Sequence, residues 1–81
     1  MQYIVNEVHG KSAVPIGNAK IFGVLSNAVK YVVAENKNQR LYVDDEPFSE
    51  AVIQERLKEK LSSVSITNET EKHVRWLITA F

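Results

Sequence analysis

Apolar residues recur at steps of three and four between Asn18 and Glu35, which is the spacing of one helix face. Asn18 stands where an N-cap side chain can accept a first-turn amide proton. We therefore expect a helix at 18–35. The apolar positions of this stripe are Ile21, Phe22, Leu25, Ala28, Val29, Val32 and Val33, and Lys20 and Lys30 lie on the opposite face.

The end of this segment has an alternative, because the run Tyr31 to Val33 is also rich in good strand formers. It could form a strand that leads into a hairpin with the segment up to Val43. The three-four spacing continues through the run, so the helix is favoured.

Strands and a second helix are indicated by period-two alternation and by turn-forming residues elsewhere in the chain. Alternation predicts strands at 2–8, 39–43 and 63–67. A second helix is expected at 49–61, with its inner face formed by Val52, Ile53, Leu57 and Leu61.

The last segment supports two interpretations. Asn68 followed by Glu71 partly matches a capping box, which would begin a third helix. The run 74–79 is rich in β-branched and aromatic residues, which favours a strand at 73–80 paired with 63–67. With the strand, the order is β-α-β-α-β-β. This order predicts a small α+β two-layer sandwich with the helices on one sheet face, in one domain spanning 1–81.

Composition narrows the function classes. The chain has 81 residues, 44% hydrophobic and 25% charged, as an ordinary globular domain does. It has no cysteine, which excludes disulfides, thiolate catalysis and cysteine zinc sites. No apolar run approaches the roughly 20 residues that span a bilayer, and the N-terminus lacks the pattern of a signal peptide. We therefore expect a cytoplasmic protein, and no motif calls for a cofactor or a metal.

The densest acidic cluster is Asp44, Asp45 and Glu46, with Glu50 close behind. Carboxylates in this number could hold calcium or magnesium, although the spacing lacks the calcium-loop pattern. Acidic residues before and within a first turn also complement the positive end of a helix, here the one expected at 49–61. A third interpretation is that these acids meet a basic patch on a partner protein.

Two tyrosines are the best candidates for exposed aromatic contacts. Tyr42 should point away from Leu41 and Val43, and Tyr31 lies at the margin of the helical stripe. Trp76 is more typical of a core or an interface. The candidate partner-binding set is therefore Asp44, Asp45, Glu46, Glu50 and Tyr42.

Net charge is zero overall but uneven along the chain. Residues 1–43 carry +3 and residues 44–81 carry −3. A zero balance argues against binding nucleic acid by bulk charge, while the asymmetry allows a basic face in the first half. The candidates for that face are Lys20, Lys30, Lys37 and Arg40.

The two histidines, His9 and His73, are the best candidates for a general base. Neither has an identifiable nucleophile or pocket in the sequence, so we do not expect an enzyme. The leading hypothesis is a small protein-binding domain with an accessory, regulatory or inhibitory role, which could act as a homodimer. Weak nucleic-acid binding through the basic N-terminal half is the alternative.

Overall fold

The computed structural model describes residues 1–12, 14–37, 39–60, 63–71 and 73–81, and within α2 it describes the side chains only as far as 58. In this part of the chain, two helices and six strands follow one another. They are β1 (Tyr3–His9), β2 (Lys20–Phe22), α1 (Leu25–Glu35), β3 (Leu41–Val43), β4 (Glu46–Pro47), α2 (Glu50–Lys60), β5 (Ser63–Asn68) and β6 (Val74–Ala80).

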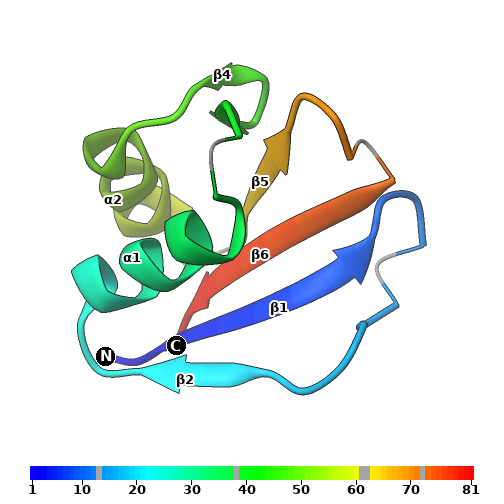
Figure 1. Cartoon of the computed structure of the whole chain (residues 1–81). Helices are drawn as coiled ribbons and strands as arrows, with labels where there is room; N and C mark the ends of the chain where they lie inside the picture. The colour runs from blue at the N-terminus through cyan, green and yellow to red at the C-terminus, as the bar shows by residue number, and fades with distance from the viewer. Residues whose placement is uncertain (13, 38, 61–62, 72) are drawn as a thin grey trace.

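All strands join one antiparallel sheet in the order β2-β1-β6-β5-β3-β4. Its centre is the long pair β1 and β6, in register from Tyr3 opposite Ala80 to His9 opposite Val74. The first and last residues extend this pair, because Gln2 and Phe81 exchange backbone hydrogen bonds of 2.8 and 2.9 Å. The chain ends therefore lie side by side (Figure 1).

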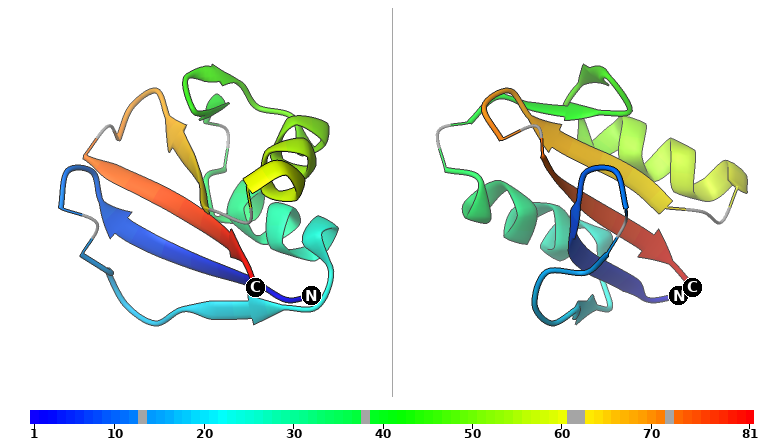
Figure 2. Two further views of the ribbon diagram at one scale, coloured as in Figure 1. Left: turned by 180° about the vertical axis from the view of Figure 1, so that it is seen from behind. Right: turned by 90° about the vertical axis from the view of Figure 1, so that its right-hand side faces the viewer.

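Both helices cover the same face of the sheet, as the views in Figures 1 and 2 agree. Strand alternation explains how this face is made, because every second residue points toward the helices. On β6 the residues Val74, Trp76, Ile78 and Ala80 are buried, and those between them are half-buried. Trp76, Ile78 and Ala80 belong to one buried cluster, which also contains Val5, Ala28, Val29, Val32, Leu41, Val43, Ile53, Leu57, Val64 and Ile66.

The α+β class predicted from the sequence is confirmed, but the predicted order omits two strands. The helix expected at 18–35 begins only at Leu25, so its first part is wrong. Lys20–Phe22 forms β2 instead and pairs with Tyr3–Val5 of β1. Gly23, a poor helix residue, separates this strand from α1.

The predicted N-cap is also wrong, because Asn18 lies ahead of β2. The N-cap of α1 is Val24, which makes no side-chain capping bond. The apolar spacing placed Ile21 on the buried face of a helix, but this residue is 62% exposed. From Leu25 to Glu35 the helix holds, so the helical prediction for 31–35 is confirmed against the strand alternative.

The second unexpected strand is β4, which forms a hairpin with β3. Asp44 and Asp45 connect the two strands and both have positive φ, 47° and 72°. A two-residue hairpin with positive φ at both positions has the type I′ pattern, which Asp tolerates better than most residues. The expected helix-entry role of Asp44, Asp45 and Glu46 is therefore wrong, because they form this hairpin and only Glu50 lies in the first turn of α2.

The C-terminal segment is a strand, so the capping-box alternative is wrong. Asn68 instead ends β5 inside a buried amide network. Its Nδ2 donates to Asn36 Oδ1 at 2.9 Å, and Asn36 Nδ2 donates to the carbonyl of Val32 at 2.8 Å. Asn68 Oδ1 accepts the amides of Thr70 and Glu71. This network fastens the end of α1 to the sheet.

Candidate functional site

The sheet face opposite the helices carries a different set of side chains. Directly paired residues point to the same face, so the register places Tyr42 beside Thr67 and Ser65 beside Leu77. The residues of this uncovered face on β3, β5 and β6 are exposed or half-buried: Tyr42, Ser63, Ser65, Thr67, Arg75, Leu77 and Thr79.

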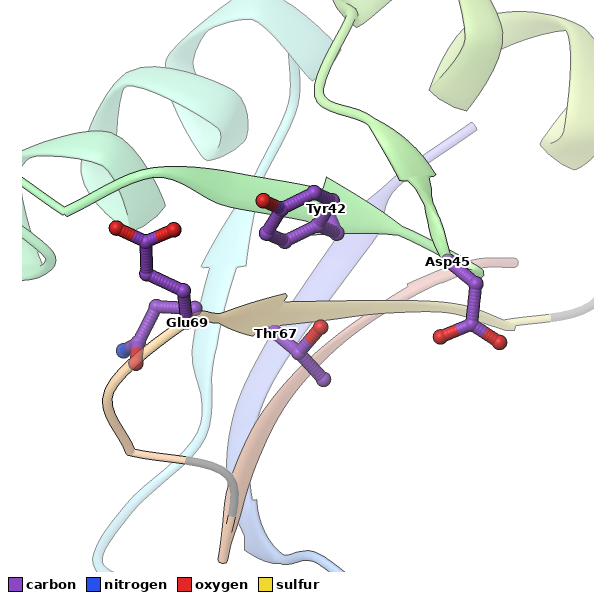
Figure 3. Close-up of a pocket in the computed structure, with 5 residues that line it drawn as sticks. Tyr42, Asp45, Thr67 and Glu69 are labelled. Atoms are coloured by element: carbon purple, nitrogen blue, oxygen red, sulfur yellow. The ribbon is translucent and has the colours of Figure 1, made fainter.

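A hollow of about 580 Å³ lies at the β3–β5 end of this face. Its lining residues are Tyr42, Asp45, Thr67, Asn68 and Glu69. Figure 3 shows Asp45 at the tip of the hairpin and Glu69 just past the end of β5, with the Tyr42 ring between them. The hollow therefore presents one aromatic ring flanked by two carboxylates.

A second, smaller hollow continues from the first. It measures about 330 Å³ and shares Asp45 and Thr67 with the larger one. Its other lining residues are Asp44, Ser65 and Arg75. Together the two hollows form a polar groove across the ends of β3, β5 and β6. We call the whole the Tyr42 groove.

The carboxylates of this region differ in how they are engaged. Arg56 of α2 donates to Asp44 Oδ2 through Nη1 and to Glu46 Oε2 through Nη2, both at 3.0 Å. Asp44 also holds β5, because its amide donates to the Ser65 carbonyl at 3.0 Å. Asp44 and Glu46 are thus structural partners of Arg56.

Asp45 and Glu69 make no ion pair among the described residues, and both are exposed. They are therefore the acidic groups of the groove that are open to a ligand. Arg40 precedes β3 and is also exposed, but it does not line the groove.

Of the five residues predicted as a partner-binding set, the structure brings together only Tyr42, Asp44 and Asp45 in this groove. Tyr42 points away from buried Leu41 and Val43, as expected. Glu50 lies elsewhere, beside a hollow of about 350 Å³ that Tyr3 and Ser26 also line.

The basic set predicted for nucleic acid is dispersed. Lys20 belongs to β2 and Lys30 to α1, so the expectation that they share one helix face is wrong. Lys37 and Arg40 lie in the connection between α1 and β3. Three separate segments therefore carry these charges.

Tyr31, the second candidate for exposed aromatic contacts, is half-buried and packs against two other rings. Its ring lies 5.6 Å from that of Phe22 and 6.0 Å from that of Trp76, between β2 and β6. Desolvation raises the pKa of the Tyr31 phenol, and the negative charges of Glu35 and Glu7 raise it further. Trp76, which we expected in a core or an interface, is 6% exposed and lies in the core.

The two histidines lie at the same end of the β1–β6 pair. His9 is opposite Val74, and the next amide, that of Gly10, donates to the His73 carbonyl at 2.7 Å. Both side chains are exposed, and neither lines any of the hollows described here. In the described part of the chain, no three histidine or carboxylate side chains are grouped to hold a metal ion.

Five residues that line the Tyr42 groove are absent from the predicted partner-binding set: Ser65, Thr67, Asn68, Glu69 and Arg75. The alternation over 63–67 did indicate a half-buried strand with polar residues on one side. Only the pairing of β5 with β3 and β6 shows what stands beside them.

The chain matches no protein-family model, no curated protein and no solved structure. No helix among the described residues has the length and apolar character needed to cross a bilayer.

Proposed function

We propose that this chain is a small non-enzymatic protein-binding domain that takes a basic side chain of its partner into the Tyr42 groove. The observation that carries the proposal is the position of the Tyr42 ring between the carboxylates of Asp45 and Glu69, which make no ion pair with any residue that the structure describes. An aromatic face and two negative charges attract the same kind of group, a cation on an organic stem.

Arginine fits this site better than lysine. Its guanidinium is planar, so it can stack on the Tyr42 ring while its edge donates to a carboxylate. Thr67 and Asn68 add polar groups to the same hollow. The hollow is already open at the ends of β3 and β5. An arginine on an extended segment of the partner would therefore reach it without any rearrangement of the sheet.

A binding role suits the groove better than catalysis. Its hydroxyls belong to Tyr42, Ser65 and Thr67. A hydroxyl needs an adjacent base to act as a nucleophile, and no histidine lines the groove among the described residues. Arg75, the cation of the smaller hollow, would instead pair with a carboxylate of the partner and so orient it.

The test is an NMR titration of the full chain with a short arginine-containing peptide. The control peptide carries citrulline, which keeps the shape of arginine and removes its charge. We expect the arginine peptide to shift the amide signals of Tyr42, Asp45 and Thr67. Equal shifts with citrulline, or shifts confined to other regions, would contradict the proposal.

Variants sharpen the test. Asp45→Asn and Glu69→Gln each remove one charge, and Asn is tolerated at positive φ. Each should weaken binding of the arginine peptide by about tenfold, the effect of about 1.4 kcal/mol. Glu55→Gln is the matched control, because Glu55 is an exposed carboxylate on α2 and away from the groove.

A further inference from the structure

The two edges of the sheet differ in whether they can accept another strand. The edge at β4 is closed, because it has two residues and Pro47 has no amide proton to donate. The edge at β2 has three residues, none of them proline. Within the described part of the chain β2 pairs with β1 alone, and Figure 1 shows it at the border of the sheet.

The β2 edge is also apolar at its centre. Ile21 is 62% exposed, although an isoleucine on a strand is usually covered. Its cross-strand neighbour on the uncovered face is Ile4, and Phe81 near by is 57% exposed. The backbone N–H and C=O groups on the outer side of such an edge strand can pair with another strand.

We propose that β2 pairs antiparallel with β2 of a second copy of this chain, about a two-fold axis at Ile21. This contact lies apart from the Tyr42 groove, at the opposite edge of the sheet. The two sheets would join into one continuous sheet. Ile21 of one copy would then pack against Ile21 of the other on the uncovered face.

Charge selects a second copy as the occupant. Pairing about Ile21 puts Lys20 opposite Phe22 of the other copy, so the two lysines do not face each other. Cross-strand partners have Cβ atoms about 5 Å apart, which brings the Lys20 ammonium within reach of the Phe22 ring for a cation–π contact. The two-fold axis makes this contact twice. The zero net charge of the chain also leaves no overall repulsion between copies.

The pairing also closes on itself. A two-fold contact uses the same edge of both copies, and the outer edges of the joined sheet are then the two closed β4 edges. The assembly therefore stops at a dimer. Because the shared ladder is short, we expect the dimer to dissociate on dilution.

The absence of cysteine from the chain allows a clean test. Ile21→Cys puts two thiols opposite each other at the axis, where the Cα separation of paired strands suits a disulfide. Under mild oxidation this variant should become a covalent dimer with native circular dichroism. Val33→Cys is the matched control, an apolar residue on α1 with 44% exposure, and should cross-link only slowly.

A second measurement needs no cross-link. Light scattering on the unmodified chain should give a dimer mass at high concentration and a monomer mass on dilution. Ile21→Lys should stay monomeric, while Val33→Lys and Leu77→Lys should behave like the unmodified chain. A monomer mass at every concentration would overturn the proposal, and so would dimers lost in Leu77→Lys but kept in Ile21→Lys, which would place the contact on the sheet face.

Discussion

Leu77 and Ile78 are neighbours on β6, yet they belong to different environments. Ile78 is 0% exposed beneath the helices, whereas Leu77 is half-buried on the face that no helix covers. The same division runs along β3, β5 and β6. The buried cluster on the covered face consists of aliphatic residues and Trp76, while the uncovered face of these strands mixes hydroxyls, Arg75, Leu77 and Tyr42. Stability therefore depends on the covered side of these strands, and the proposed binding site lies on their other side.

The largest effect on stability should come from truncating one residue on each face of the sheet. Ile78→Ala should lower the free energy of unfolding by about 3–4 kcal/mol, because it leaves a cavity in a closed core. Leu77→Ala should cost about 1 kcal/mol, since water can reach the vacated space. Urea unfolding followed by circular dichroism measures both. Similar losses would mean that the uncovered face is packed against something in solution.

The buried amide network should give the next largest effect. Asn68→Ala would leave Asn36 Oδ1 and the amides of Thr70 and Glu71 without their partner, at a cost of about 2–3 kcal/mol. Thr67→Ala on the uncovered side of the same strand is the control and should cost less than about 1 kcal/mol. If the two variants unfold at the same urea concentration, the network does not hold α1 to the sheet.

The hairpin tip should separate stability from binding. Asp45 has φ 72°, a conformation that glycine adopts without strain, so Asp45→Gly should stabilise the chain by about 0.5–1 kcal/mol. The same change removes a carboxylate from the Tyr42 groove and should weaken the binding of the arginine peptide. Thermal unfolding and peptide titration check the two effects. If the variant is more stable and still binds the arginine peptide as tightly as the unmodified chain does, Asp45 is not part of the proposed site.

The smallest expected effect concerns pH. The pKa of the Tyr31 phenol is raised above its ordinary value of 10.0 in the folded chain. The unfolded chain therefore loses this proton first, so the stability contribution is present below pH 10.0 and falls as the pH rises through the folded pKa. Tyr31→Phe should lose less stability over that range than the unmodified chain. Ultraviolet absorbance should show one tyrosine that ionises at a higher pH than the others, and this step should be missing in the Tyr31→Phe variant.

Much of the fold could be predicted from local patterns, because several segments bury one clear stripe. The alternation in 63–67 and the β-branched run at 74–79 gave β5 and β6, and the spacing after Leu25 gave α1. The prediction of a helix at 18–24 was wrong because the same few residues are compatible with both helical spacing and a short strand. Its partner, Tyr3–Val5, lies too far away in sequence to be seen by a local pattern.

The candidate site could be predicted only in part, for a related reason. The acidic cluster and Tyr42 were visible as residues, but their roles were not. Arg56 engages Asp44 and Glu46 from α2, and Glu69 joins Asp45 from beyond β5. Which carboxylates remain open depends on contacts between elements that lie many residues apart.

Local patterns in the sequence were sufficient to predict the α+β class, the lack of cysteine chemistry and the segments of α1 from Leu25, α2, β1, β3, β5 and β6. These follow from periodic burial and composition, which act within a segment. Contacts between distant segments place β2 at the edge of the sheet, make Asp44 and Asp45 the turn of a hairpin, and position Tyr42 between Asp45 and Glu69. Short strands and surface grooves gain their definition from partners across the sheet, and hydrogen-bonded register is a property of pairs rather than of single segments.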